Sequence, residues 1–309
     1  MMRKIFRDKK ILLIAMFGVF LLAKAQQTPE YTQYMYNTMS INSGYTSSIE
    51  NLEANLLYRS QWVGMEGAPK TANFSILAPF SYQRMGAGLN IVNDQIGPVS
   101  ETLITGNYAY NVPLDLLNKL AVGVNAGARF MNINWSKGLS MNSNDPLFGK
   151  NVSEVKPVLG LGVYFYSDKY YVGLSVPNFI RANYYDDIQQ AKTAEAFHYY
   201  FIAGYVFDLT SNVKFKPSAM VKAVQGSPLA YDLSANFLFH HKFTLGAAYR
   251  WDDSVSALAG FQITDGLFIG YSYDYTISNL SKYNSGSHEI LLKFRFLDKD
   301  SGIRSPRFF

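Results

Sequence analysis

Residues 266–277 read Gly-Leu-Phe-Ile-Gly-Tyr-Ser-Tyr-Asp-Tyr-Thr-Ile, an alternation of apolar with small or polar side chains. The odd positions, from Leu267 to Ile277, are all aliphatic or aromatic, whereas the even positions hold glycine, serine, aspartate and threonine apart from Phe268. Because successive side chains of a strand point to opposite faces, the stretch predicts a sheet with one apolar and one polar face. The apolar face would cover a core in a soluble sandwich or barrel, or would contact lipid in an outer-membrane barrel.

The first 25 residues have the layout of a secretory signal peptide. Basic residues between positions 3 and 10 precede an apolar run at 11–22, which is followed by Ala23-Lys24-Ala25. A run of about a dozen residues is too short to span a bilayer comfortably, so we expect export with cleavage after Ala25. The chain has no cysteine, which excludes a lipoprotein anchor, disulfides, thiolate metal sites and a cysteine nucleophile.

The net positive charge belongs to this leader. Residues 1–25 carry six of the 28 Lys and Arg and one of the 23 Asp and Glu, which leaves 22 basic and 22 acidic residues in the mature chain. No basic run or basic helix occurs elsewhere. A formal charge near zero therefore gives no reason to expect a nucleic-acid partner.

The alternation at 266–277 recurs along the mature chain in about fourteen segments, each near the ~10 residues that cross a bilayer as a tilted strand. The segments are roughly 51–62, 70–80, 84–93, 100–111, 119–133, 155–166, 169–177, 196–208, 212–223, 228–240, 242–251, 254–263, 266–277 and 287–297. A soluble sandwich would show the same alternation, so periodicity alone does not decide between the two classes.

Three further features favour a membrane barrel. Aromatic residues gather at strand ends, as interfacial girdles do, and about fourteen strands without a domain break close into a barrel more easily than they stay open. Charged residues on the inner face would be costly in a soluble core but suit a wet or hydrogen-bonded lumen. The aromatics are Tyr58 and Trp62, Tyr108 and Tyr110, Tyr170 and Tyr171, and Tyr249 and Trp251; the charges are Lys214, Lys216, Lys222, Asp232, Arg250, Asp274, Lys293 and Arg295.

The sequence thus predicts an all-β, transmembrane, antiparallel up-and-down barrel over residues 51–297. Residues 26–50 form a separate segment at or in the barrel mouth, and 298–309 form a periplasmic tail. Short turns on one side and long loops at 134–154 and 178–195 on the other suit periplasmic turns and surface loops. Glycine pairs at Gly86/Gly88 and Gly160/Gly162 leave one strand face without side chains, where a loop, plug or partner could approach the wall.

Nothing in the sequence supports catalysis or a cofactor. The four histidines match no metal-ligand spacing, and Ser287-His288-Glu289 cannot form a relay because neighbours on a strand face opposite sides. We therefore expect a protein that is not an enzyme and binds no metal.

The mature N-terminal third carries a family resemblance. Gln33-Tyr34-Met35-Tyr36-Asn37, then Asn42, then the stretch 58–64 (Tyr-Arg-Ser-Gln-Trp-Val-Gly), then 67–71 (Gly-Ala-Pro-Lys-Thr) resemble the PorP/SprF family of Bacteroidetes type IX secretion system membrane proteins. One departure is Asn42-Ser43-Gly44-Tyr45, where members commonly have an Asn-Pro-Ala-Tyr-like turn. Glycine can supply a tight turn by another backbone route.

The resemblance implies an outer-membrane β-barrel associated with type IX secretion and gliding motility. The candidate partner-binding residues are Gln33, Tyr34, Asn37, Asn42, Arg59, Gln61, Trp62, Gly64, Gly67, Pro69 and Thr71, with a candidate tail contact at Arg304, Pro306, Arg307, Phe308 and Phe309. Alternation places Arg59 and Gln61 on one face of the first strand with Glu53 and Asn55. That face either hydrogen-bonds the segment 26–50 or docks a secretion-system component.

Two functions remain open at this point. The first is a non-enzymatic outer-membrane component that assists secretion or retains specific cargo or adhesins at the surface, with membrane lipid, other type IX components and secreted cargo as partners. A periplasmic peptidoglycan-linked protein is one candidate among those components. The alternative is a porin or small-solute outer-membrane transporter, which the alternating pattern permits equally well.

Overall fold

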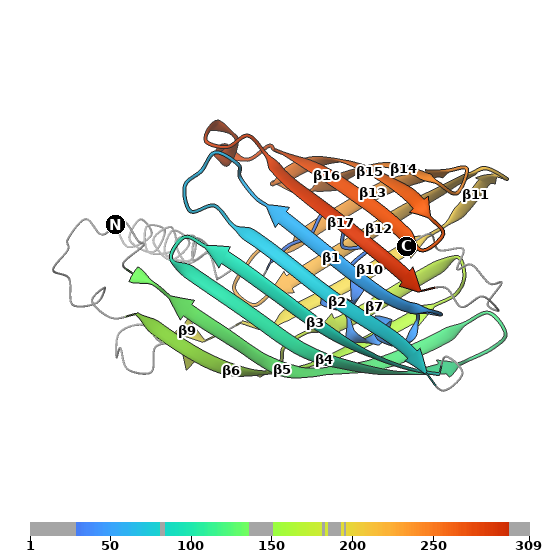
Figure 1. Ribbon diagram of the computed structural model, residues 1–309, viewed down its shortest axis with the longest axis horizontal. Coiled ribbons are helices and arrows are strands. Elements are labelled where there is room, and N and C mark those ends of the chain that lie inside the picture. The colour runs from blue at the N-terminus through green and yellow to red at the C-terminus, as the bar shows by residue number, and fades with distance from the viewer. Residues whose placement is uncertain are drawn as a thin grey trace, which may run out of the picture.

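The structure is a computed structural model that describes residues 29–80, 84–135, 151–180, 183–184, 193–194 and 196–296. Its strands are tilted and wrap into one barrel (Figure 1). The wall strands are β1 (Leu52–Ser60), β2 (Lys70–Phe80), β3 (Met85–Ile96), β4 (Val99–Pro113), β5 (Lys119–Ile133), β6 (Val152–Tyr166), β7 (Tyr170–Val176), β10 (His198–Tyr205), β11 (Phe207–Thr210), β12 (Val213–Val224), β13 (Ala230–Phe239), β14 (Phe243–Arg250), β15 (Ser254–Thr264), β16 (Leu267–Thr276) and β17 (Ser287–Phe296). The strands β8 (Asn183–Tyr184) and β9 (Thr193–Ala194) form a separate pair.

The barrel closes between its first and last strands. β1 pairs antiparallel with β17 from Leu52↔Phe296 to Ser60↔His288, and β10 bridges the gap left by β8 and β9 by pairing with both β7 and β12. β11 continues the line of β10 beyond Val206 and pairs with β12. The wall is therefore a closed antiparallel barrel of 14 strands, which confirms the predicted fold class.

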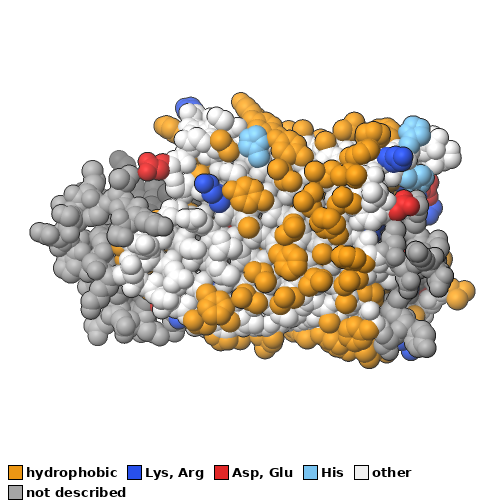
Figure 2. Space-filling view, in the orientation of Figure 1, with side chains coloured by type: hydrophobic (Ala, Val, Ile, Leu, Met, Phe, Trp, Pro, Cys, Tyr) orange, Lys and Arg blue, Asp and Glu red, His pale blue; other side chains and the backbone are white. Residues whose placement is uncertain are grey.

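The two faces predicted at 266–277 are present in β16. Gly270, Ser272, Asp274 and Thr276 are buried inside the barrel, whereas Tyr271 and Tyr275 are exposed on the outside. The space-filling view shows an apolar band across the face of the barrel that is in view (Figure 2). Within the described residues no helix is long and apolar enough to cross a membrane.

The two ends of the barrel differ. One end, named here the turn end, carries the connections 114–118, 167–169, 211–212, 240–242 and 265–266, together with the start of β1 and the end of β17. The other, the loop end, carries the longer connections 61–69, 134–151, 177–197 and 277–286. Since outer-membrane barrels have short periplasmic turns and longer outer loops, this asymmetry predicts that the turn end faces the periplasm.

The outward face supports this orientation. Toward the loop end of β3 to β6 the outward side chains become polar, and Asn93 Nδ2 donates to Thr102 Oγ1 at 2.8 Å on the exposed surface. Asn132 and Ser153 continue this polar region on β5 and β6. Figure 2 shows the apolar band giving way to non-hydrophobic surface on that side. The barrel thus extends beyond its lipid-facing band at the loop end.

The aromatic girdle prediction is wrong at Tyr171. Tyr170 faces outward and stacks with Tyr205 at a ring-centroid distance of 6.3 Å, but its neighbour Tyr171 points into the barrel and is 3% exposed. Adjacent strand residues face opposite sides, so they cannot both belong to a girdle. Trp62 lies beyond the end of β1, in the loop, with φ 47°.

Candidate functional site: the barrel lumen

Residues 29–50, named here the lumen segment, occupy the interior of the barrel. They form two short 3-10 turns, η2 (Thr38–Ser40) and η3 (Ser43–Ser47), and every side chain from 31 to 49 is buried except the half-buried Ser40. The segment starts at the loop end, where Glu30 meets Arg250, and finishes at the turn end, where the chain continues into β1. The lumen of this barrel is therefore filled by its own N-terminal segment.

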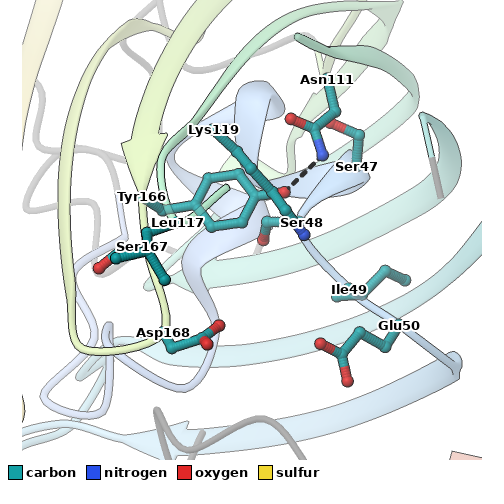
Figure 3. Close-up of a pocket in the computed structure, with 10 residues that line it drawn as sticks. All are labelled: Ser47, Ser48, Ile49, Glu50, Asn111, Leu117, Lys119, Tyr166, Ser167 and Asp168. Carbon is teal, nitrogen blue, oxygen red and sulfur yellow. Dashed lines mark hydrogen bonds between the residues drawn. The ribbon is translucent and has the colours of Figure 1, made fainter. Parts of the chain in front are cut away.

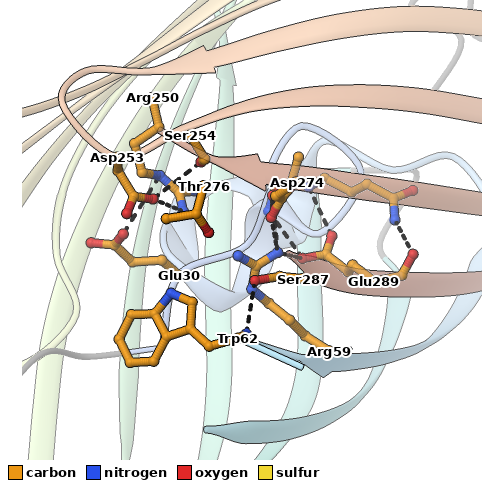
Figure 4. A network of polar contacts seen from close by, with 12 residues as sticks. Glu30, Arg59, Trp62, Arg250, Asp253, Ser254, Asp274, Thr276, Ser287 and Glu289 are labelled. Atoms are coloured by element: carbon orange, nitrogen blue, oxygen red, sulfur yellow. Dashed lines mark hydrogen bonds and ion pairs between the residues drawn. The ribbon is translucent and has the colours of Figure 1, made fainter. Parts of the chain in front are cut away.

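Arg59 of β1 anchors the part of the lumen segment that lies near the loop end (Figure 4). Its Nη1 lies 2.6 Å from Asp274 Oδ2 and 3.2 Å from Glu289 Oε2, and it donates to Thr32 Oγ1 at 3.0 Å. Arg59, Asp274 and Glu289 are each no more than 2% exposed. One guanidinium thus connects two wall carboxylates to the segment that fills the lumen.

The same carboxylates bind the lumen segment directly. Glu289 accepts the backbone N–H groups of Thr32 at 3.0 Å and of Gln33 at 2.8 Å, while Asp274 accepts the Thr32 hydroxyl at 2.8 Å. Hydrogen bonds to an ionised acceptor are about twice as strong as neutral ones. The chain direction at Thr32 and Gln33 is therefore fixed by wall residues from β16 and β17.

A second ionic cluster lies at the loop end. Lys222 Nζ contacts Glu30 Oε1 at 2.5 Å, and Arg250 Nε lies 2.8 Å from Asp232 Oδ1 and 3.6 Å from Glu30 Oε2. Burial by itself raises the pKa of Glu30, but Arg250 and Lys222 outweigh that effect and lower the pKa to about 2. Glu30 therefore stays ionised between Lys222 of β12 and Arg250 of β14.

The middle of the lumen segment is held by amides and aromatic rings. Asn37 Nδ2 donates to Asn73 Oδ1 at 2.8 Å, and Asn73 in turn donates to Asn90 at 2.7 Å. The ammonium of Lys216 lies 5.4 Å from the centre of the Tyr36 ring, a cation–π distance. Strands β2 and β12 thus each contact the segment, and β3 supports the β2 contact through Asn90.

Near the turn end, strands β3, β5 and β6 carry glycines on their inner face, and the lumen segment lies directly against these glycines. A Cβ added at Gly123 would lie 2.4 Å from the carbonyl carbon of Ser43, and one at Gly86 would lie 2.6 Å from that of Thr46. Gly162 faces Asn42 in the same way. The prediction that Gly86, Gly88 and Gly162 allow a plug to approach the wall is confirmed, with Gly88 facing Met39; Gly160 instead faces Pro177.

Asn42 determines the turn that departs from the family pattern. Its Oδ1 accepts the N–H of Gly44 at 2.9 Å, and its Nδ2 donates to the carbonyls of Val163 at 3.1 Å and Leu174 at 3.3 Å. Gly44 does not have a positive φ. A Cβ at Gly44 would lie 3.1 Å from the backbone of Gly162 and Tyr164, so glycine here relieves a tight contact and does not supply a left-handed turn residue.

The rest of the family motif lies in the loop after β1. Gln61 donates its N–H to the Pro69 carbonyl at 2.9 Å, and Trp62 donates its N–H to Ser287 Oγ at 3.1 Å. Gly64 and Gly67 have φ values of 99° and 74°, where a side chain would strain the backbone. The prediction that Gln61 shares an inner face with Arg59 is wrong, since β1 ends at Ser60.

The sequence-based candidates therefore separate into two groups. Arg59, Gln33, Tyr34, Asn37, Asn42 and Thr71 are buried in the lumen, whereas Gln61, Trp62, Gly64, Gly67 and Pro69 shape the loop at 61–69. Thr71 donates to Asp94 Oδ1 at 2.5 Å. The tail residues Arg304, Pro306, Arg307, Phe308 and Phe309 lie outside the described residues.

Sequence reasoning did not select Glu30, Thr32 or Glu289, although all three belong to the ionic clusters. Glu289 could have been found from the alternation of β17, which places it on the same face as Lys293. Glu30 and Thr32 lie in a segment without periodicity, and no local pattern shows which wall strand they meet. Within the described part of the chain, no group of three or more His, Asp or Glu side chains could hold a metal ion.

Comparison with protein families shows that residues 23–294 match the model described as type IX secretion system membrane protein PorP/SprF. Among solved structures, a Pseudomonas aeruginosa FadL homologue matches with a TM-score of 0.50 and 11% identity, covering 87% of this chain and 95% of that one. The CymD monoaromatic hydrocarbon channel matches with a TM-score of 0.52 and 12% identity, covering 85% and 93%. These structural likenesses show the barrel fold alone. Comparison with curated proteins found no match.

Proposed function

The chain belongs to the PorP/SprF family of type IX secretion system membrane proteins, and on that basis we propose that it is a non-enzymatic outer-membrane component that assists secretion or surface retention of specific cargo or adhesins. The single observation that carries this proposal, beyond family membership, is the filled lumen. Every side chain from Tyr31 to Ile49 except Ser40 is at least nine-tenths buried inside the barrel. A barrel closed in this way is suited to binding partners at its ends.

The contacts of the lumen segment support a permanent plug. It is bound at the loop end by two ionic clusters, in the middle by Asn73, and near the turn end by Ser175, whose hydroxyl donates to the Ile41 carbonyl at 2.6 Å. Removing one partner of a buried ion pair costs about 3–5 kcal/mol, so leaving the lumen would break several costly contacts together. Under this proposal the partners are other type IX components, secreted cargo and membrane lipid.

The two ends would have different roles. The loop end, shaped by Trp62, Gly64 and Gly67, faces the cell surface and would contact cargo or adhesins. The turn end faces the periplasm and would contact periplasmic components of the machinery. Export with cleavage after Ala25 remains part of the proposal, as does a role in gliding.

The test is deletion of the coding sequence, with complementation by the full chain. We expect surface display of specific type IX cargo to fall while uptake of small solutes through the outer membrane stays unchanged. Complementation with the wild-type chain should restore display, and a Lys242→Gln variant, changed at an exposed turn position, serves as a matched expression control. Unchanged cargo display in the deletion strain would refute the proposal, and a selective loss of solute uptake would favour a porin or transporter instead.

A further inference from the structure

The wall closes between two strands that no turn connects. β1 pairs with β17 along all of its 9 residues, whereas the other neighbouring strands of the described wall follow one another along the chain, with β11 as the continuation of β10. The chain enters β1 from the lumen segment, whose residues 47–50 line a small hollow at the turn end (Figure 3). In a hairpin the turn fixes which residues face each other. At the junction of β1 and β17, named here the seam, the register has to come from contacts and not from a turn.

The inner side of the seam carries opposite charges that face each other. Glu53 of β1 lies directly opposite Arg295 of β17, with Arg295 Nε 3.3 Å from Glu53 Oε2. Further along β1, Arg59 lies directly opposite Glu289, and Figure 4 shows this pair, in which Arg59 Nη1 is 3.2 Å from Glu289 Oε2. Lys293 adds a third contact, because its Nζ lies 3.3 Å from Glu53 Oε2. Ion pairs thus join β1 to β17 towards both ends of the seam.

The outer side of the seam carries no comparable pattern. Leu56 lies opposite Leu292, and Tyr58 lies opposite Ile290. If one strand slid by two residues, apolar side chains would still face apolar side chains on this side. Contact with lipid therefore does not distinguish one closing register from another.

The inner charges do distinguish the registers. A slip of one residue would turn every inner side chain outward and place Glu53 and Arg59 against lipid. A slip of two residues keeps the faces, but it places Arg59 opposite Leu291 in one direction or opposite Ser287 in the other. Separating the partners of a buried ion pair is strongly destabilising. Of these registers, only the observed one keeps both pairs of opposite charges directly opposed.

An ion pair of the same kind inside a hairpin provides a comparison. Asp232 of β13 lies directly opposite Arg250 of β14, with Asp232 Oδ1 2.8 Å from Arg250 Nε. These two strands are joined by the short connection 240–242. Since the turn already sets the register there, loss of this ion pair should weaken the hairpin without shifting its strands.

We propose that the inner charges of the seam, Glu53 and Arg59 on β1 with Glu289, Lys293 and Arg295 on β17, select the register in which the barrel closes. The inference concerns assembly and goes beyond the proposed function, because it holds whatever the barrel binds. Arg59 also donates to the lumen segment, so one guanidinium joins the closing strands and the plug.

The test measures the register by disulfide formation in full-length protein in outer membranes treated with an oxidant. The chain has no cysteine, so two introduced cysteines can form only one disulfide within it. Leu56→Cys/Leu292→Cys joins directly opposite positions and reports the observed register. Leu56→Cys/Phe294→Cys and Leu56→Cys/Ile290→Cys report slips of two residues in either direction, since diagonal neighbours about 7–8 Å apart are beyond ordinary disulfide reach. Yields are measured on the heat-modifiable barrel band.

Reversing one charge should change the register, and exchanging the pair should restore it. We expect Glu53→Lys to lower the yield of the observed-register disulfide roughly tenfold or more and to raise that of a slipped register, because a buried ion pair becomes a repulsion. Glu53→Lys/Lys293→Glu should recover the observed register. The matched control is Asp232→Lys, measured with Leu233→Cys/Tyr249→Cys at directly opposite positions of β13 and β14, which should keep its yield.

The remaining outcomes also decide the matter. Full yield of the observed-register disulfide in Glu53→Lys barrels would show that the charges do not select the register, and would overturn the proposal. If Glu53→Lys forms no heat-modifiable barrel, the exchanged variant decides: barrels in the observed register support the proposal, and absence of barrels or a slipped register contradicts it. An equal loss of yield in the Asp232→Lys hairpin would also contradict it, because the effect would then not belong to the seam.

Discussion

At the residue scale, the structure depends most on Arg59. It is 2% exposed and lies within ion-pair distance of Asp274 and Glu289, so it places a cation against two buried carboxylates. Its hydrogen bond to Thr32 extends this cluster to the lumen segment. Arg59 belongs to the family-like motif, and its role in this structure is to attach the plug to the wall.

Replacing Arg59 with methionine should strongly destabilise the barrel with its plug. The side-chain volume is largely retained, but two buried carboxylates lose their cation, and breaking a buried pair in this way costs about 3–5 kcal/mol. Urea unfolding in detergent measures the effect. The triple variant Arg59→Met/Asp274→Asn/Glu289→Gln should recover part of the loss, and Lys169→Met, at an exposed ion pair, should have little effect. Equal stability of Arg59→Met and wild type would contradict this account.

Glu30 should make the attachment of the plug sensitive to acid. Its pKa is lowered from an ordinary 4.5 to about 2, so its contribution to stability is complete above pH 4.5 and is lost as the pH falls towards 2. The stability difference between wild type and Glu30→Gln should therefore shrink over that interval and stay constant from pH 5 to 7. Denaturant unfolding at several pH values measures this difference. A stability difference between wild type and Glu30→Gln that grows on acidification would contradict the lowered pKa of Glu30.

At the element scale, the glycine faces of the wall strands determine where the plug fits. Gly123→Leu on β5 would place a side chain against the backbone at Ser43, and overpacking of this kind costs about 1–3 kcal/mol. We expect the segment to leave the wall there. Since the chain has no cysteine, Ser47→Cys, which is 1% exposed in the plug, can report it through labelling by a water-soluble maleimide.

The control for that experiment is Ala126→Leu on the same strand. Ala126 faces outward, so the same increase in volume meets lipid or detergent and should leave Ser47→Cys protected. Rapid labelling in both variants, or in neither, would mean that the glycine face does not hold the plug.

The strands of the wall and their two faces could largely be predicted from the sequence, and β16 shows the reason. A strand that separates lipid from lumen repeats its chemistry every second residue, so Gly270, Ser272 and Asp274 could be assigned to the inside without knowing their partners. Inner charges such as Arg250 and Asp232 were assigned in the same way, and they are paired in the structure. Strand ends were less predictable. The expected strand 196–208 is interrupted at Val206, and Gln61 lies beyond β1.

The lumen segment could be predicted only in part. Its lack of periodicity and the glycine faces suggested a plug, but the contact of Glu30 with Lys222 joins residues 192 positions apart. Such pairings follow from the closure of the whole barrel and leave no local pattern. The motif around Gln61 and Pro69 likewise belongs to a different environment from Arg59, although only Ser60 separates Arg59 from Gln61.

At the scale of the whole molecule, the direction of the plug has a consequence for topology. Because Glu30 lies at the loop end, a tag inserted between Thr28 and Pro29 should be accessible to antibody from outside intact cells. The same tag in the turn 240–242, at the opposite end, should become accessible only after the outer membrane is permeabilised. The reverse pattern of accessibility would show that the orientation is wrong.

The central claim is that the lumen is closed by the N-terminal segment. Planar-bilayer recording of the purified full-length protein tests it most directly, with a variant lacking residues 29–50 recorded in parallel. The account predicts no steady conductance from the wild-type barrel and an open conductance from any deleted variant that still forms a heat-modifiable barrel. A steady open conductance from the wild-type protein would contradict it.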